Sequence, residues 1–205
     1  MVDLQKENNM DLSLQRIINA VERNDYIVFK DDKKNFNLNI VGIRSDDERS
    51  NKFNDRMFIF WKYLGYWNSI EFAITTDPGL YWRTHPMNIK GTAILKPGQY
   101  RGMWALGKHK GKYPALVQVK PCTVFRDPDK DEMIEAKGFE DVGLFGINHH
   151  RANAKRTSTE VDKWSAGCQV QPNPVLFDIE MQLFKEASKV WGNSFTYTLL
   201  EESDF

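Results

Sequence analysis

The segment of residues 145–170 constrains the fold of this chain more than any other segment, because it places reactive side chains at both ends of one loop. Residues 142–147 form a short apolar run interrupted by glycine, which predicts a buried strand. His149 and His150 follow near the end of that run. Residues 151–163 are polar and charged, which predicts a loop. The chain is therefore expected to leave a strand at two histidines and to return after the loop.

The returning chain reaches a cysteine through three small residues, Ser165, Ala166 and Gly167. Small residues let the backbone turn tightly, so the N–H groups of Gly167 and Cys168 are candidates for an oxyanion hole. An imidazole beside Cys168 would take the thiol proton, and the thiolate would attack a carbonyl carbon. The pattern predicts a Cys–His nucleophile that reacts below the ordinary thiol pKa. The alternative is a buried structural cysteine near two strand-end histidines.

These residues resemble the catalytic motif of the L,D-transpeptidase domain (the YkuD-type domain), in which a His is followed by Ser/Thr-His-Gly-Cys. Fourteen residues separate His150 from Ser165, and fifteen separate His149 from it. The chain matches the motif at Ser165, Gly167 and Cys168. The resemblance implies that Cys168 is the nucleophile and that one of the two histidines is its base.

The chain departs from that motif at two places. Ala166 stands where the family usually has His, and Gln169-Val170 stands where an apolar residue followed by Arg or Asn is usual. The first departure leaves the nucleophile intact, whereas the second concerns how a peptide donor is held. The Ile-Asn-x-His-Arg and Ser-x-Gly-Cys-Gln forms also resemble variants found in bacteriophage and Bacteroidetes proteins.

The base can be argued from strand geometry. Successive side chains of a strand point to opposite faces, so His149 and His150 cannot both face Cys168 while the strand continues. The spacing of the family motif favours His150, with Arg151 as a loop anchor behind it. His149 remains the alternative base, and both His149 and Arg151 are candidates for contacts with substrate.

A second, weaker resemblance lies in residues 96–100. The family has a Thr-Pro-x-Gly-x-Tyr/Phe segment near its cleft, and Lys-Pro-Gly-Gln-Tyr is a relaxed version of it. The resemblance implies that Tyr100 lines the cleft, together with Trp164. Ser165 is expected to steady the imidazole or its loop.

The resemblance implies a cysteine acyltransferase or peptidase acting on peptidoglycan stem peptides of the bacterial cell wall. An amine that resolves the acyl-enzyme gives a cross-link, as in an L,D-transpeptidase, and water gives cleavage, as in an L,D-peptidase. The sequence leaves both outcomes open. The competing hypothesis is a non-catalytic peptidoglycan-binding or structural phage protein on the same fold, which Ala166 and Gln169-Val170 favour.

Composition excludes several classes of protein. The 28 basic and 28 acidic residues give a formal net charge of zero without a basic run, which argues against a nucleic-acid partner. No apolar run reaches the length of a membrane span. Residues 1–10 lack the apolar region of a signal peptide. We therefore expect cytoplasmic synthesis, with action at the cell wall after phage lysis or specialised secretion.

No metal or cofactor is predicted. His85 has no second ligand at a zinc-like spacing, and the acidic residues 127–132 lack the pattern of a calcium loop. The two cysteines do not make a disulfide framework, and Cys122 has the apolar neighbours of a structural residue. The glycine- and lysine-rich residues 104–112 are expected to form a loop whose Lys108, His109, Lys110 and Lys112 make a solvated basic rim.

The predicted fold is α+β, a mainly β sandwich or barrel resembling the L,D-transpeptidase domain, with a few covering helices. Residues 1–90 are expected to be a helix and a β-rich extension packed on the core, and residues 91–205 the catalytic core. Helices are expected over residues 11–24, capped by Asp11 or Ser13, and from Asn173-Pro174 to Gly192. The apolar stripe of the second helix is expected to consist of Leu176, Ile179, Leu183, Ala187 and Val190. The expected strands are Tyr26–Phe29, Phe36–Ile43, Arg56–Trp61, Ile70–Thr75, Tyr113–Lys120, Thr123–Arg126 and Phe195–Leu200.

Overall fold

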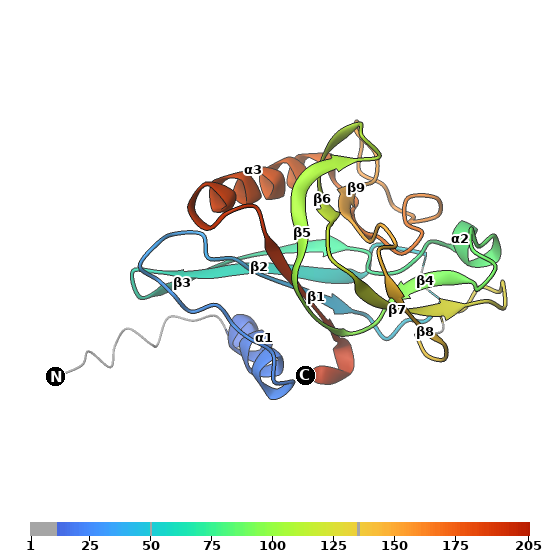
Figure 1. The fold of residues 1–205 in the computed structure, drawn as a ribbon, viewed down its shortest axis with the longest axis horizontal. Helices are drawn as coiled ribbons and strands as arrows, with labels where there is room; N and C mark the ends of the chain where they lie inside the picture. The colour runs from blue at the N-terminus through green and yellow to red at the C-terminus, as the bar shows by residue number, and fades with distance from the viewer. Residues whose placement is uncertain (1–11, 50, 135) are drawn as a thin grey trace.

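The computed structural model describes residues 12–49, 51–134 and 136–205, so Asp11 lies outside the described residues. In chain order its elements are α1 (Leu12–Arg23), β1 (Asn39–Arg44), β2 (Asp55–Tyr63), β3 (Tyr66–Ile74), α2 (Leu80–Thr84), β4 (Thr92–Leu95), β5 (Gly98–His109), β6 (Tyr113–Gln118), β7 (Cys122–Asp127), β8 (Glu140–Gly143), β9 (His149–Arg151), β10 (Gln169–Gln171), α3 (Pro174–Trp191), β11 (Phe195–Glu201) and a short 3-10 helix (Glu202–Asp204). Figure 1 shows their arrangement.

An eight-stranded sheet dominates the molecule, in the order β10-β9-β6-β5-β11-β1-β2-β3. Its two ends approach each other just beyond β3, where Thr75 pairs with Val170 of β10. The N–O distances of this pair are 3.0 and 2.9 Å, so two hydrogen bonds join the ends of the sheet into a near-barrel. A second sheet of three strands, β4-β7-β8, lies beside it.

Residues 1–90, expected to form an extension on the core, supply strands of the large sheet itself. β1 pairs in parallel with β11 and antiparallel with β2, and β2 pairs with β3 through the hairpin around Leu64 and Gly65. Both hairpin residues have positive φ, 50° and 86°, which a tight turn between twisted strands requires. The candidate site therefore rests on a sheet built from both halves of the chain.

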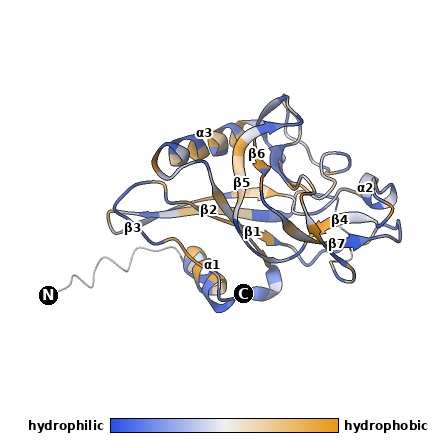
Figure 2. Ribbon diagram, in the orientation of Figure 1, coloured by the Kyte–Doolittle hydropathy of each residue, from blue (hydrophilic) through white to orange (hydrophobic). Residues whose placement is uncertain are grey.

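Alternating side chains on the sheet fill two apolar clusters. Along β1, Ile40 enters the cluster covered by α3, whereas Val41 and Ile43 enter the cluster covered by α1. This alternation follows from the two-residue period of a strand. Figure 2 shows hydrophobic and hydrophilic residues interspersed on both helices, as expected for helices that cover a sheet on one side.

Helix α3 begins and ends as the sequence predicts, but it buries a different face. The side chain of Asn173 accepts hydrogen bonds from the N–H groups of Val175 and Leu176, and Gly192 caps the other end at φ 85°. The expected apolar stripe is only partly right, because Leu176, Ile179 and Val190 are largely exposed. The buried residues are Phe177, Glu180, Met181, Leu183, Phe184 and Ala187.

Three expectations about strands and loops are wrong. Residues 104–109 are not a loop, because β5 continues through them to His109, and only residues 110–112 form the turn before β6. The strand expected over residues 142–147 ends at Gly143, and a separate short strand carries the two histidines. Tyr26–Phe29 forms no strand; its backbone bonds to side chains instead, with Ile27 N–H donating to Gln99 and Phe29 N–H to Asn39.

The fold is mostly β with a few helices, which confirms the predicted α+β, mainly β class. The other predicted strands and the α1 helix are present with shifted ends. None of the helices in the described residues has both the length and the apolar content that crossing a membrane requires.

Candidate active site

Two short parallel strands form the frame of the site. β9 and β10 pair in parallel, with His149 opposite Gln169 and His150 opposite Val170. Side chains opposite each other in a parallel ladder point to the same face, and neighbours along a strand point to opposite faces. The two histidines therefore face opposite sides of the sheet, as predicted.

His149 faces helix α3 and is fully buried. Its Nε2 lies 2.7 Å from Oε2 of Glu180, and the amide of Gln171 donates to Oε1 of the same carboxylate at 2.6 Å. Phe177 and Phe184 surround the ring, with Trp104 on its other side. These contacts tie α3 to β9 and β10 and leave His149 no route to Cys168 or to substrate, so the candidate substrate contact at His149 is wrong.

His150 faces the other side, where a second imidazole lies against it. The His109 and His150 rings are stacked with centroids 3.9 Å apart. Nδ1 of His150 lies 2.8 Å from the carbonyl oxygen of Arg151, which can only accept, so Nδ1 carries the ring proton. Nε2 therefore holds the lone pair that a general base needs. Burial, together with the nearby His109, lowers the pKa of His150 to about 3.

His109 is the site residue that the sequence analysis placed wrongly. It is buried at the end of β5, not part of a solvated rim, and its Nδ1 lies 3.3 Å from the amide nitrogen of Asn148. Burial, with a smaller effect of Lys110, lowers its pKa to about 4. Alternation along residues 104–109 puts His109 on the face opposite to Trp104 and Leu106, so no local pattern indicated that it is buried.

Tyr113 and Arg151 enclose the pair of imidazoles. The Tyr113 hydroxyl donates to the Arg151 carbonyl at 3.2 Å, and its oxygen lies 3.2 Å from Nδ1 of His150. The Arg151 guanidinium lies over the Tyr113 ring, 4.0 Å from its centroid. Arg151 thus anchors the loop as predicted, through its carbonyl and its side chain.

Cys168 comes directly before β10, and it lies close to Tyr113, whose hydroxyl contacts His150. Its half-buried Sγ donates to the carbonyl oxygen of Gly146 at 3.2 Å. Burial raises the pKa of the thiol, while the backbone N–H of Asn148 and the charge of Lys110 oppose that rise. The expectation of a thiol pKa below the ordinary value is therefore wrong for the resting site. Among the described residues, Sγ forms no hydrogen bond with a ring nitrogen of His150.

The loop before Cys168 is fixed by the buried Ser165. Its Oγ donates to the Cys168 carbonyl at 2.8 Å and accepts from the Gly167 N–H at 3.1 Å. Ser165 therefore steadies the loop and not the imidazole. The Gly167 N–H is already used, which corrects its expected role in an oxyanion hole and leaves the Cys168 N–H as the candidate donor of that pair.

Gly167 is required by its surroundings. Its φ is 121°, and a Cβ placed on it would lie 2.5 Å from the carbonyl oxygen of Ala93. No L-residue side chain is accommodated there without moving β4 or the loop. This close approach holds the loop of Cys168 against the second sheet.

Two further predicted cleft residues lie elsewhere. The Tyr100 hydroxyl donates to the Lys96 carbonyl at 2.6 Å, and burial raises its pKa, with a further contribution from the neighbouring Cys122. Tyr100 thus belongs to the core on the side of Cys122, and its expected place in the cleft is wrong. Trp164 is 40% exposed and lines a hollow within its own loop.

Cys122 is structural, as predicted. It is buried, its sulfur accepts a hydrogen bond from the Gln118 amide at 3.3 Å, and burial raises its pKa to about 12. Both cysteines are free thiols. Among the described residues no three His, Cys, Asp or Glu side chains are grouped so as to hold a metal ion.

Behind the site lies a buried polar network that sequence reasoning missed. Gln169, at a position that departs from the family motif, accepts from the Tyr197 hydroxyl at 2.6 Å and donates to the Thr76 carbonyl at 3.4 Å. Nη2 of Arg44 donates a hydrogen bond to the same Thr76 carbonyl, and Nε of Arg44 forms an ion pair with the Asp77 carboxylate at 2.8 Å. Burial, with the nearby Asp77, raises the pKa of Asp55 to about 7.

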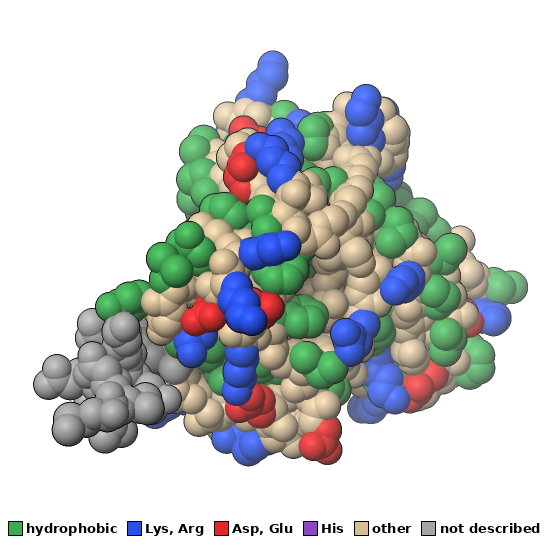
Figure 3. Space-filling model, turned by 60° about the vertical axis from the view of Figure 1, so that its left-hand side comes forward, with side chains coloured by type: hydrophobic (Ala, Val, Ile, Leu, Met, Phe, Trp, Pro, Cys, Tyr) green, Lys and Arg blue, Asp and Glu red, His purple; other side chains and the backbone are tan. Residues whose placement is uncertain are grey.

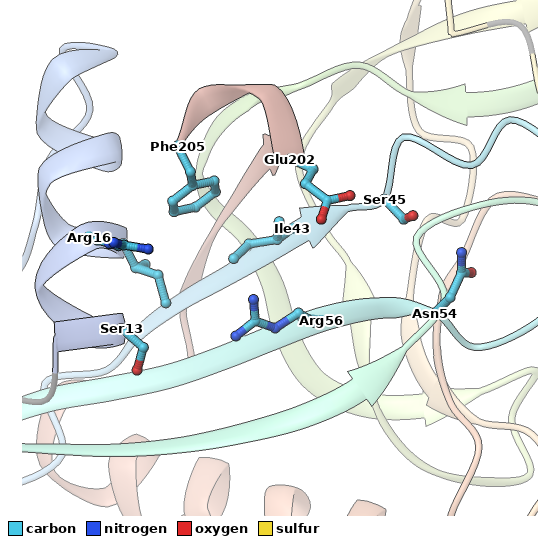
Figure 4. Close-up of a pocket in the computed structure, with 9 residues that line it drawn as sticks. Ser13, Arg16, Ile43, Ser45, Asn54, Arg56, Glu202 and Phe205 are labelled. Carbon is cyan, nitrogen blue, oxygen red and sulfur yellow. The ribbon is translucent and has the colours of Figure 1, made fainter.

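A cavity of about 280 Å³ lies beside the loop of Cys168, with Ala166 and Phe145 in its wall. A larger one, about 440 Å³, lies between α1, the β1–β2 region and Phe205 (Figure 4). That larger cavity holds Arg16, Arg56 and Glu202 but no cysteine or histidine. The smaller cavity has no cysteine or histidine in its lining either, but it adjoins the loop of Cys168 through Ala166.

Basic side chains are not gathered into one patch on the face of the molecule that Figure 3 shows. Figure 3 shows Lys and Arg side chains spread over the visible face among hydrophobic and neutral groups, without a single basic patch. This distribution agrees with the formal net charge of zero. Comparison with protein-family models, with curated proteins and with solved structures finds no match to this chain.

Proposed function

We propose that the protein is a cysteine-dependent acyl-transfer enzyme of the L,D-transpeptidase type, acting on peptidoglycan stem peptides. The observation that supports the proposal is the parallel pairing of β9, which carries His150, with β10, which begins directly after Cys168. Tyr113 lies close to both residues, because its hydroxyl contacts His150 and the Cys168 sulfur acts on its pKa. The Ser165-to-Cys168 motif and its spacing from His150 support the same reaction class. Cys168 is the nucleophile, and His150 is its base.

The reaction begins from a neutral thiol and a neutral imidazole. Nε2 of His150 takes the Sγ proton as Sγ forms a bond to the carbonyl carbon of the peptide, and the Cys168 N–H stabilises the developing oxyanion. The C–N bond then breaks, and the imidazolium gives its proton to the leaving amine. Water or a second amine attacks the thioester, and Nε2 of His150 takes the proton of that nucleophile. The C–S bond then breaks, and the imidazolium returns the proton to Sγ, which restores the thiol.

The neutral pair suits this sequence of steps. Burial disfavours both the thiolate and the imidazolium in the resting site. The lone pair on Nε2 is nevertheless available, because Nδ1 is held by the Arg151 carbonyl. Sγ must leave the Gly146 carbonyl and turn towards His150 when substrate binds, since no hydrogen bond joins them among the described residues at rest.

Mass spectrometry of the protein with purified stem peptides tests the proposal. We expect an acyl adduct on Cys168, none on Cys122, and none in the Cys168→Ala variant. His150→Ala should lower the rate of adduct formation by about 10²–10⁴-fold, as removal of a general base does. Profiling of the products distinguishes new cross-links, which identify a transferase, from shortened stems, which identify a peptidase. A wild-type rate retained by Cys168→Ala would refute the assignment.

A non-catalytic peptidoglycan-binding or structural protein is the second candidate, and one observation favours it. The Sγ hydrogen bond to Gly146 and the burial of His150 are compatible with a purely structural role for both side chains. Under this alternative, stem peptides bind but leave no adduct on Cys168, and the His150→Ala variant changes neither binding nor products.

A further inference from the structure

The cavity beside Cys168 is built against the loop that carries it. Ala166 lines the cavity two residues before Cys168, and Phe145 lines it next to Gly146, whose carbonyl contacts Sγ. Ala93 also lines it and lies against Gly167. The cavity therefore adjoins the segments on both sides of Sγ, and it offers space for a side chain of a peptide whose carbonyl carbon reaches Sγ.

One buried cation gives the cavity its polarity. Arg126, 7% exposed, is the charged residue in the lining, and its guanidinium lies over the Phe145 ring, 4.7 Å from the centroid. Nε and Nη2 donate to one oxygen of Asp141, at 3.2 and 3.1 Å, and Asp141 is not part of the lining. Nη1 has only a long contact of 3.4 Å with the Gly91 carbonyl. The guanidinium thus retains donor capacity for a bound anion.

The walls of the cavity suit a short apolar stem that ends in a charge. Trp82 and Phe145 provide aromatic surface, and the Thr92 hydroxyl holds the Trp82 carbonyl at 2.5 Å. Asn88 adds a neutral polar group at the surface end. The volume of about 280 Å³ remains open beside Ala166 because a methyl group stands there in place of a larger side chain.

We propose that this cavity is a specificity site for a peptide residue whose side chain ends in a carboxylate, with Arg126 as the residue that recognises the carboxylate. The inference rests on the proposed function for its assignment to substrate, but binding to the cavity can be measured without turnover. A carboxylate is favoured over an ammonium group because no acidic side chain lines the cavity. A charge-assisted hydrogen bond to a buried guanidinium is stronger than one to a neutral amide.

The test is calorimetric binding to the Cys168→Ala protein, which cannot form an acyl-enzyme. The ligands are a blocked tripeptide with a central Glu and its counterpart with a central Gln. We expect the Glu peptide to bind about tenfold more tightly, a difference of about 1.4 kcal/mol. Arg126→Met should abolish that preference. Ala166→Leu, which adds bulk at a residue that lines the cavity, should weaken both peptides and serves as a second test if Arg126→Met fails to fold.

The outcomes separate this inference from the proposed function. Equal affinities for the Glu and Gln peptides, a preference unchanged in Arg126→Met, or affinities unchanged in Ala166→Leu would overturn the specificity site. A Glu preference that Arg126→Met abolishes, with both peptides weakened by Ala166→Leu, would support it, whether or not the wild-type protein acylates Cys168. Absence of the adduct in wild type, with the Glu preference intact, would overturn only the acyl-transfer reaction.

Discussion

At the scale of single residues, the candidate site is assembled from neutral groups. A thiol with a raised pKa lies close to Tyr113, whose hydroxyl contacts an imidazole with a pKa of about 3, and a second imidazole with a pKa of about 4 is stacked on the first. Such a pair does not form a thiolate–imidazolium ion pair at neutral pH. Deprotonation of Cys168 is therefore expected to accompany attack on the substrate.

Alkylation of Cys168 over a pH series tests this resting state. Because burial raises the thiol pKa, the rate with iodoacetamide should have its inflection above the ordinary thiol value of ~8.5. Lys110→Met should move the inflection higher still, because Lys110 lowers this pKa. Cys122 is the internal control and should stay unmodified. An inflection well below ~8.5 in wild type, lost in His150→Ala, would show an ion pair instead.

At the scale of elements, the turn before Cys168 depends on a glycine packed against β4. Gly167→Ala places a Cβ 2.5 Å from the Ala93 carbonyl at φ 121°, so the loop or β4 must move. The matched control is Gly138→Ala. Gly138 has a φ of 97°, and nothing lies within 4 Å of a Cβ added there, so this variant introduces backbone strain without a steric clash. Each positive φ costs about 1–3 kcal/mol.

Urea unfolding of both glycine variants measures the extra cost at Gly167. We expect Gly167→Ala to lose more free energy of unfolding than Gly138→Ala, and to change the alkylation rate of Cys168 as the loop shifts. Equal losses in the two variants, with Cys168 reactivity unchanged in both, would mean that the contact with Ala93 does not hold the loop.

Helix α3 is fixed to the site strands by a buried carboxylate. Glu180 accepts from Gln171 and bonds to Nε2 of His149, at 2.6 and 2.7 Å. Glu180→Leu removes the partner of both groups and should destabilise the protein by about 3–5 kcal/mol, as breaking a buried pair does. Glu186→Leu, on the exposed side of the same helix, should cost less than about 1 kcal/mol. Thermal unfolding compares the two, and similar melting temperatures would contradict this account.

The ends of a helix can be predicted from the sequence where capping residues mark them. Asn173, Pro174 and Gly192 mark the ends of α3 by backbone chemistry that needs no partner. The buried face of that helix was predicted less well, because Glu180 is buried only through His149 and Gln171, which come from other elements. An apolar count along the helix cannot anticipate a charged residue in the core.

The site shows the same division between local and long-range information. The side chains of His149 and His150 point to opposite faces of the sheet, which follows from strand geometry alone and was predicted. The buried position of His109 depends on the pairing of β5 with β6 and of β6 with β9, which no local pattern specifies. The cavity lined by Arg126 likewise exists only because the second sheet packs beside the loop of Cys168.

At the scale of the whole molecule, buried titratable groups make stability depend on pH. His109 and His150 are neutral in the folded protein down to about pH 4 and pH 3, whereas unfolded histidines take up protons near pH 6.5. The unfolded state therefore binds more protons in this window, and stability falls as the pH falls. Asp55 acts in the opposite direction, because its folded pKa of about 7 exceeds the unfolded value of 3.8.

His109→Phe tests this balance, because it keeps an aromatic ring against His150 and removes one titrating group. Between pH 6 and 4.5, the free energy of unfolding should fall less steeply with decreasing pH in the variant than in the wild type. The two slopes should differ by up to about 1.4 kcal/mol per pH unit. Urea titrations at several pH values measure the slope. A slope unchanged by the substitution would show that His109 takes up its proton in the folded state as readily as in the unfolded one.

The order of strands in the large sheet has a consequence for the protein during its synthesis. β11, residues 195–201, lies between β5 and β1, both of which leave the ribosome long before it. Until β11 arrives, the strands on either side of the gap each have an unpaired edge, and such edges are open to mispairing with other chains. Completion of the sheet therefore waits for residues that are translated after Cys168 and His150. The emerging chain should hold the Cys168 thiol in an unfinished scaffold, and its acquisition of structure should occur late.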